Sequence, residues 1–213
     1  MIVIVDYGMG NLRSVGKAFL SQGIDASVTR DPGEIARADG LVLPGVGAFG
    51  DCMKNLAEYG LTDPIKEHVD SGKPFLGICL GLQVLFEGSD ESPDVPGLGI
   101  LEGRVVRFSP SEEERLKVPH MGWNRVSIKK ESPVLAGIPD GSWFYFVHSY
   151  YPDPKDPGVI AVTSNYGVEF TAAVARDNLF ACQFHPEKSS ADGLRILRNF
   201  AALTGGGIKA ASA

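Results

Sequence analysis

Short apolar runs alternate with amphipathic segments through the first half of the chain, and this alternation constrains the fold more than any other feature. Residues 2–6, 24–29, 41–43 and 74–78 have the length and apolar character of buried strands, whereas residues 11–22 carry apolar side chains at helical spacing. Further helices are expected over residues 32–38, 49–59, 63–71 and 81–87. Alternating strands and helices form a parallel sheet with right-handed crossovers, so we predict an α/β fold.

The second half of the chain is rich in strand-like segments. We expect strands over residues 103–108, 123–129, 143–147, 159–163, 170–175 and 179–184. They are predicted to extend the first sheet in antiparallel fashion, followed by a last helix over residues 191–203. The acidic and basic run 111–117 is interpreted as a solvated loop. A length of 213 residues suits one domain, so we predict a single domain over residues 1–204 and a flexible tail over residues 205–213.

Charge and cysteine content narrow the class of partner and the compartment. The 20 basic and 26 acidic side chains give a net charge of −6, which does not favour binding to nucleic acid or to an anionic membrane. We expect neither a signal peptide nor a membrane span, because the longest apolar stretch is interrupted by glycine and glutamine. Three scattered cysteines are too few and odd in number for a disulfide framework, so we expect a reducing, cytoplasmic compartment.

The clearest chemical signal is Gly-Ile-Cys-Leu-Gly over residues 77–81, where a predicted strand meets a predicted helix. This is the nucleophile-elbow pattern with Cys79 in place of serine, and its glycines allow the sharp turn that exposes the side chain. A helix N-terminus also stabilises a thiolate. The structural alternative is a small cysteine of the core.

A thiol nucleophile needs a base, and the base needs an orienting partner. His185 and Glu187 lie two residues apart at the end of a predicted strand, on the same side as Gln183. The Glu187 carboxylate can hold one tautomer of His185 and leave the second ring nitrogen for Cys79. We therefore predict a catalytic triad of Cys79, His185 and Glu187.

A glycine-rich segment over residues 44–50 follows a predicted strand. Backbone N–H groups of Gly45, Val46 and Gly47, together with that of Leu80, would form an oxyanion hole. The same segment also matches G-x-G-x-x-G, so a dinucleotide-binding module is a competing interpretation. That motif normally follows the first strand of its own βαβ unit, whereas this one follows a later strand.

The remaining cysteines and histidines are given structural roles. Cys52 and Cys182 are expected to be core thiols, and His68 a surface residue of a helix. A metal site could draw on four side chains of suitable type: Cys79, His120, His148 and His185. Their spacing matches no zinc pattern, so we predict no metal site and no other cofactor.

Three segments together resemble the triad-type, class I glutamine amidotransferases: residues 44–47, 77–83 and 185–187. Three others narrow the resemblance to the glutaminase subunits of imidazole glycerol phosphate synthase: residues 6–11, 119–124 and 147–151. The resemblance covers nearly the whole chain. It implies a flavodoxin-like sheet, mostly parallel with an antiparallel extension and with helices on both faces.

The resemblance also implies an activity, which is hydrolysis of glutamine to glutamate and ammonia through a Cys79 thioester. It implies four residues that hold glutamine: Gln83, Glu91, Ser149 and Tyr150. For Gln83 the structural alternative is a helix residue that faces solvent. Tyr7, within the segment 6–11, receives no role.

The resemblance further implies a partner, a (β/α)₈-barrel cyclase subunit that receives the ammonia and forms imidazole glycerol phosphate in histidine biosynthesis. Asn11, Trp123 and Lys188 would lie at or near the interface. Each has a structural alternative: a helix N-cap for Asn11, packing for Trp123 and a solvated charge for Lys188. The remaining alternative functions are another triad-type amidotransferase, a cysteine hydrolase of the same scaffold, or the dinucleotide-binding module.

Overall fold

A mixed nine-stranded sheet is the centre of the structure, a computed structural model that describes residues 1–110 and 116–205. Its strand order is β2-β1-β3-β4-β13-β12-β11-β8-β9. The first five strands in this order are parallel: β2 (Ala26–Thr29), β1 (Ile2–Val5), β3 (Gly40–Gly45), β4 (Phe75–Cys79) and β13 (Leu179–Cys182). The side chains of β1 are buried in alternation in two separate apolar clusters, so this strand is covered on both faces as predicted.

The other four strands extend the sheet in antiparallel fashion, as the sequence predicts. They are β12 (Val168–Arg176), β11 (Ile160–Tyr166), β8 (His120–Ile128) and β9 (Trp143–His148). Strand β9 is therefore one edge of the sheet and β2 the other.

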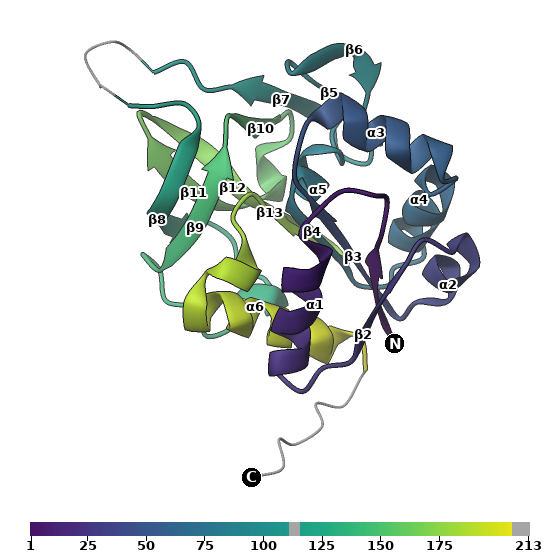
Figure 1. Ribbon diagram of the computed structural model, residues 1–213. Coiled ribbons are helices and arrows are strands. Elements are labelled where there is room, and N and C mark those ends of the chain that lie inside the picture. Colours follow the sequence, from purple (N-terminus) through teal and green to yellow (C-terminus); the bar gives the residue numbers. More distant parts are fainter. Residues whose placement is uncertain (111–115, 206–213) are drawn as a thin grey trace.

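Helices cover both faces of the parallel half (Figure 1). On one face α1 (Leu12–Ser21) packs against α6 (Ser190–Leu203), and their buried side chains share one apolar cluster. On the other face lie α2 (Pro32–Arg37), α3 (Phe49–Glu58) and α4 (Thr62–Asp70). This arrangement is the α/β fold with helices on both faces.

A second, four-stranded sheet was not predicted from the sequence. Its order is β10-β7-β5-β6, formed by β10 (Tyr150–Pro154), β7 (Gly103–Arg107), β5 (Gly88–Ser89) and β6 (Ser92–Pro96). The expectation that residues 103–108 extend the main sheet is therefore wrong, because β7 pairs instead with β10 and β5. In Figure 1 this small sheet lies in the upper part of the molecule, with β5 and β6 above α3.

The helix predicted over residues 81–87 is also wrong in length, since α5 covers only Leu80–Gln83. Among the described residues directly after α5, the N–H groups do not make i to i−4 bonds beyond Val84. Leu85 N and Phe86 N donate to carbonyl groups three residues back, and Glu87 N donates to the Gly103 carbonyl oxygen of β7. A donor bonded in this way does not continue the α-helical ladder. The part of the chain that the structure describes also contains three 3₁₀ turns: η2 (Pro133–Leu135), η3 (Pro157–Val159) and η4 (Pro186–Lys188).

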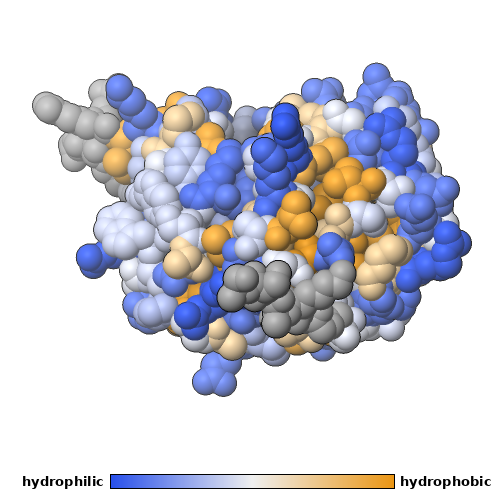
Figure 2. Space-filling view, turned by 60° about the horizontal axis from the view of Figure 1, so that its bottom comes forward, coloured by the Kyte–Doolittle hydropathy of each residue, from blue (hydrophilic) through white to orange (hydrophobic). Residues whose placement is uncertain are grey.

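Figure 2 shows one face of the molecule, with hydrophilic residues around its margin and apolar residues grouped near its centre. Among residues 1–110 and 116–205, no helix combines the length and the apolar character needed to cross a membrane. Most of the predicted loop over residues 111–117 and most of the predicted tail over residues 205–213 lie outside the described residues.

Candidate active site

Cys79 occupies a sharp turn between β4 and α5. Its backbone has φ +55° and ψ −108°, a conformation that non-glycine residues rarely adopt. A Cβ atom at Gly81 would overlap the Leu43 carbonyl oxygen, and one at Gly77 would lie 2.8 Å from the Cβ of Ala181. Both flanking positions therefore accept only glycine, and the strained turn has the geometry of a nucleophile elbow.

His185 and Glu187 form a buried pair beside this turn. Atom Nδ1 of His185 lies 2.9 Å from Oε1 of Glu187, with the two side chains 2% and 1% exposed. This bond fixes the imidazole orientation. Atom Nε2 of His185 is buried and has no hydrogen-bond partner among the described residues. A buried ring nitrogen without a partner remains able to accept or donate a proton.

Charges around His185 oppose the effect of its burial. Burial alone lowers the pKa of His185, but the neighbouring Cys79 and the Glu187 carboxylate raise this pKa to about 10. The cationic imidazolium is thus the favoured form of His185 beside these two groups.

The glycine-rich segment lies directly beside Cys79. Gly45 pairs with Cys79 in the register of β3 and β4. Val46 and Gly47 follow and line the same cavity as Cys79, and Gly47 has φ +103°, which favours glycine. The segment predicted to supply oxyanion donors therefore faces the predicted nucleophile.

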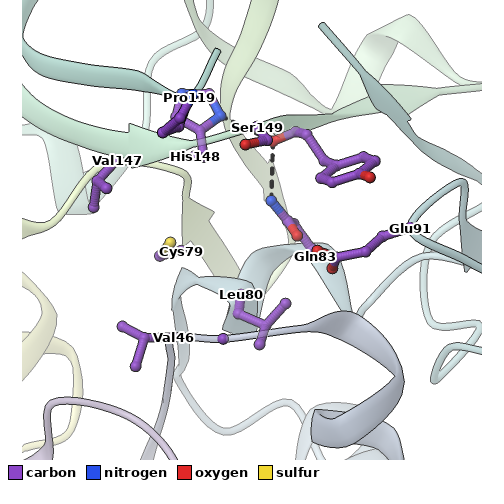
Figure 3. Close-up of a pocket in the computed structure, with 11 residues that line it drawn as sticks. Val46, Cys79, Leu80, Gln83, Glu91, Pro119, Val147, His148 and Ser149 are labelled. Carbon is purple, nitrogen blue, oxygen red and sulfur yellow. Dashed lines mark hydrogen bonds between the residues drawn. The ribbon is translucent and has the colours of Figure 1, made fainter.

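A cavity of about 400 Å³ opens at Cys79 and Leu80. Figure 3 shows Val46 and Leu80 below the cavity, Pro119 and His148 above it, and Gln83 and Glu91 at one side. All four residues predicted to bind glutamine line it: Gln83, Glu91, Ser149 and Tyr150. Gly45, His185 and Glu187 are not among the lining residues.

Gln83 is a buried residue at this cavity, and the alternative of a solvent-facing helix residue is wrong. Gln83 is only 5% exposed to solvent. Its Nε2 donates to the Tyr150 carbonyl oxygen at 3.0 Å and to Oε1 of Gln183 at 3.0 Å (Figure 3 shows the first bond). Gln183 in turn donates from Nε2 to Sγ of Cys79 at 3.6 Å. Sequence reasoning gave Gln183 no role in the site, although its position two residues before His185 pointed to it.

Glu91 and Ser92 occupy the N-terminus of α3. Oε2 of Glu91 accepts a hydrogen bond from Phe49 N at 2.7 Å, and Oγ of Ser92 accepts one from Gly50 N at 3.2 Å. A dinucleotide phosphate would need these N–H groups and would meet the Glu91 carboxylate. The structure therefore disfavours the dinucleotide-binding interpretation of the glycine-rich segment.

Two buried histidines form a hydrogen-bond chain beside the cavity. Nδ1 of His120 lies 2.9 Å from Nε2 of His148, and Nδ1 of His148 lies 2.8 Å from the Tyr150 carbonyl oxygen. A carbonyl only accepts, so Nδ1 of His148 carries a proton and its Nε2 accepts from His120. The amide of Asn124 donates to the remaining nitrogen of His120 at 3.2 Å. Burial lowers the pKa of His120 to about 4 and that of His148 to about 3, so both rings are neutral near pH 7.

Of the other residues predicted to lie in the core or at the surface, two were predicted correctly and one was not. Cys52 and Cys182 are buried, as predicted, and burial raises the pKa of Cys52 to about 12. The expectation that His68 is a surface residue is wrong, because it is 3% exposed. Its Nε2 lies 3.1 Å from the Pro74 carbonyl oxygen at the start of β4. Helical periodicity alone placed His68 on α4 without showing which face the sheet covers.

Two of the three residues predicted at a partner interface, Trp123 and Lys188, contact the same aromatic ring, that of Tyr145. Trp123 is 48% exposed and meets the Tyr145 ring edge-on, and Nζ of Lys188 lies 5.7 Å from the centre of the same ring. Tyr145 is also next to the triad, with its ring centre 6.5 Å from that of His185. Asn11 precedes α1 and makes no side-chain capping bond, so it is not an N-cap in the usual sense.

A strained cysteine at the carboxyl end of a parallel strand, next to a buried histidine and carboxylate, defines a thiol-dependent hydrolase of the α/β type. Residues 3–203 match the model of the family described as "Glutamine amidotransferase class-I". The chain is 58% identical over 203 residues to imidazole glycerol phosphate synthase subunit HisH of Syntrophotalea carbinolica, covering 94% of this chain and 98% of that protein. It is 55% identical to the HisH subunit of Methanothermobacter thermautotrophicus, with 94% and 97% covered.

The fold agrees with this match. A solved structure described as a glutamine amidotransferase superposes with a TM-score of 0.74 at 23% identity, over 97% of this chain and all of that one (100%). The chain belongs to the class-I glutamine amidotransferase family, among the HisH subunits of imidazole glycerol phosphate synthase.

Proposed function

We propose that this chain hydrolyses glutamine at Cys79 and delivers the ammonia to the cyclase subunit of imidazole glycerol phosphate synthase. The observation that carries the proposal is the arrangement of Cys79 on its strained turn, beside the buried His185–Glu187 pair and at the mouth of the cavity. The cyclase subunit then forms imidazole glycerol phosphate and AICAR in histidine biosynthesis. Three free cysteines are consistent with the cytoplasm as the site of this reaction.

The chemistry begins with the Cys79 thiolate. Sγ attacks the side-chain amide carbon of glutamine, and the carbonyl electrons move to oxygen to give a tetrahedral intermediate. His185 protonates the amide nitrogen as the C–N bond breaks, which releases ammonia and leaves a thioester. A water molecule then attacks the thioester, giving up a proton to His185, and glutamate leaves. Glu187 stabilises the imidazolium in both halves.

The oxyanion formed in each half needs backbone donors. The N–H of Leu80 follows the nucleophile. Gly45 pairs with Cys79 in the register of β3 and β4, and Val46 and Gly47 follow it along the same cavity as Leu80. Donors fixed in this way stabilise the charge as it develops. Loss of one such donor typically lowers kcat by roughly 10²- to 10³-fold.

The other end of glutamine carries an amino and a carboxylate group, and the cavity offers groups for both. We propose that Gln83, Glu91 and the backbone at Ser149 and Tyr150 hold them. The Gln83 amide and the Tyr150 carbonyl are already bonded to each other, so this wall of the cavity is rigid before substrate enters. A pre-formed wall lowers the cost of ordering on binding.

The partner would cover the outer face of the β8–β9 hairpin. Met121, Trp123 and Trp143 are 63%, 48% and 49% exposed on neighbouring strands. Large exposed apolar side chains of this kind are typical of protein interfaces. Because Tyr145 links Trp123 and Lys188 to the surroundings of His185, a partner on this face would enclose the ammonia as it leaves.

The decisive experiment is production of glutamate by the chain mixed with the cyclase subunit and its nucleotide substrate. We expect glutamate with the wild type and a loss of roughly 10⁶-fold in kcat for Cys79→Ala. Cys52→Ser is the matched control, since it removes another buried thiol from α3, keeps a polar group beside Tyr7 and should keep kcat within twofold. The Cys79→Ala complex should still make imidazole glycerol phosphate from added ammonium. The proposal is wrong if wild type yields no glutamate, or if only the Cys52 variant is inactive.

A further inference from the structure

The hydroxyl of Tyr7 contacts the first residue of the glycine-rich segment over residues 44–50. Tyr7 is fully buried, and its Oη donates to the Pro44 carbonyl oxygen at 2.8 Å. The backbone pairing of β1 with β3 ends at Ile4 and Val42, two residues before Pro44. Beyond the end of the β1–β3 pairing, the Tyr7 hydroxyl therefore provides a hydrogen bond to the Pro44 carbonyl of β3.

Contacts around Gly45 show how close this hydroxyl lies to the proposed oxyanion hole. A Cβ atom at Gly45 would lie 2.6 Å from Oη of Tyr7 and 2.6 Å from Cβ of Leu80. The Gly45 backbone is therefore confined between Tyr7 and the residue that follows the nucleophile. The Tyr7 hydroxyl therefore limits how far the Gly45 backbone can move relative to Leu80.

The loop that follows Tyr7 supports the rest of the segment. A Cβ atom at Gly47 would lie 2.5 Å from Cε of Met9, and one at Gly10 would lie 3.6 Å from the Pro44 carbonyl oxygen. The loop over residues 7–10 and the segment over residues 44–47 are in contact along their length. A change in the loop would consequently move the segment.

A purely space-filling role does not explain the hydroxyl. Phenylalanine would fill the same space without bringing a polar group into the core, and a buried hydroxyl is unfavourable unless it is hydrogen-bonded. Burial raises the pKa of Tyr7, with the neighbouring Cys52 as a further cause, so the hydroxyl stays protonated as a donor. Among residues 1–110 and 116–205, its hydrogen bond to the main chain is the one to Pro44.

We propose that Tyr7 is a positioning residue for the oxyanion hole: its hydrogen bond to Pro44 holds Gly45, Val46 and Gly47 opposite Leu80 while the tetrahedral intermediate forms. This inference rests on the proposed glutaminase function. Tyr7 is not among the residues that line the cavity, so it acts on kcat through the backbone of the segment.

The test is Tyr7→Phe in the complex with saturating cyclase subunit and its nucleotide substrate. Since loss of a direct donor costs roughly 10²–10³ in kcat, we expect a smaller loss of about tenfold with KM for glutamine within twofold of wild type. The control is Tyr166→Phe, which removes a tyrosine-to-carbonyl bond of the same length at an exposed position, from Oη of Tyr166 to the Lys117 carbonyl oxygen at 2.8 Å, in the antiparallel half of the sheet. This control should keep the wild-type kcat.

A second readout separates a positioning role from general damage. Alkylation of Cys79 by iodoacetamide, followed by peptide mass spectrometry, needs the thiolate but no oxyanion hole. We expect the Tyr7→Phe complex to alkylate within twofold of the wild-type rate. Wild-type kcat in Tyr7→Phe would overturn the inference, as would an equal loss of kcat and alkylation rate. A wild-type complex that makes no glutamate would overturn the proposed function instead.

Discussion

His185 is the residue whose charge depends most on its neighbours. Its pKa in the folded protein is about 10, raised above the ordinary 6.5 by the neighbouring Cys79 and the Glu187 carboxylate against the effect of burial. A group whose folded pKa is raised contributes stability that is complete below pH 6.5 and is lost as the pH rises towards 10. The free energy of unfolding should therefore decrease between these two pH values.

Glu187→Gln tests this account of the pair. Without the carboxylate the pKa of His185 falls, so the decrease in unfolding free energy above pH 6.5 should become smaller. We expect kcat to fall roughly 10³- to 10⁴-fold, less than for loss of the nucleophile, because Glu187 orients and does not attack. Urea unfolding from pH 6 to 10 and glutamate production provide the two measurements.

Glu169→Gln is the control for this substitution, since it removes an exposed carboxylate paired with Lys129 at 3.3 Å. It should leave the pH dependence and kcat unchanged. An unaltered pH dependence in Glu187→Gln would contradict the assigned cause of the raised pKa.

At this scale, residues with a local signature could be predicted from the sequence and residues without one could not. Cys79 was identified by the glycines that its turn requires, and those glycines have no room for a Cβ. Tyr7 and Gln183 act across 37 and 104 positions of the chain, on Pro44 and Cys79 respectively. No local pattern records contacts of that kind, because the fold alone brings the partners together.

At the scale of elements, the β8–β9 hairpin is held by a pair of histidines. His120 and His148 face each other in the register, and His120 stacks on Tyr166 with ring centres 4.1 Å apart. His148 also holds the Tyr150 carbonyl at the cavity wall. The hairpin therefore shares its polar interior with the proposed glutamine site.

His120→Phe should weaken both the hairpin and the cavity. Phenylalanine keeps the stacking but leaves Nε2 of His148 without its donor, which costs about 1–3 kcal/mol of unfolding free energy for a buried acceptor. KM for glutamine should rise, because the His148 ring that binds the Tyr150 carbonyl loses the hydrogen bond that orients it. Urea unfolding and glutamate production at pH 7.5 measure the two effects.

Acid gives an independent check on the same pair. Burial lowers the pKa of His120 to about 4 and that of His148 to about 3. A lowered histidine pKa means that the unfolded chain takes up protons first, so stability is complete above pH 6.5 and is lost towards pH 4. His120→Phe should show a shallower loss between pH 6.5 and 5. An equally steep loss would contradict the neutral pair.

Elements were predicted well where their partners are local and less well where they are distant. The alternation of strands and helices through residues 2–78 predicted the parallel half of the sheet. The small sheet was missed because β5 has only two residues and β10 begins directly after β9. The helix predicted over 81–87 ended early because Glu87 N donates to the distant Gly103 carbonyl oxygen and not to Gln83. Strand pairing and hydrogen bonds to distant segments are tertiary properties.

At the scale of the whole molecule, the two edges of the main sheet differ in what they expose. Strand β9, with its neighbour β8, presents Met121, Trp123 and Trp143, whereas β2 at the opposite edge presents Val28, which is 47% exposed. Only the first edge adjoins the triad, through Tyr145 and His185. A partner that receives ammonia has to bind where the ammonia leaves, so it should bind the β8–β9 edge.

Trp123→Ala tests this placement because it removes an exposed aromatic side chain without opening the core. We expect the Kd for the cyclase subunit to rise roughly 30-fold, which corresponds to about 2 kcal/mol, the loss typical of an aromatic hot spot. Val28→Ala, at the opposite edge, should change the Kd less than twofold. Isothermal titration calorimetry measures both, and thermal unfolding should show that both variants fold. Equal losses for the two variants, or none for Trp123→Ala, would place the partner elsewhere on the molecule and would require a different route for the ammonia.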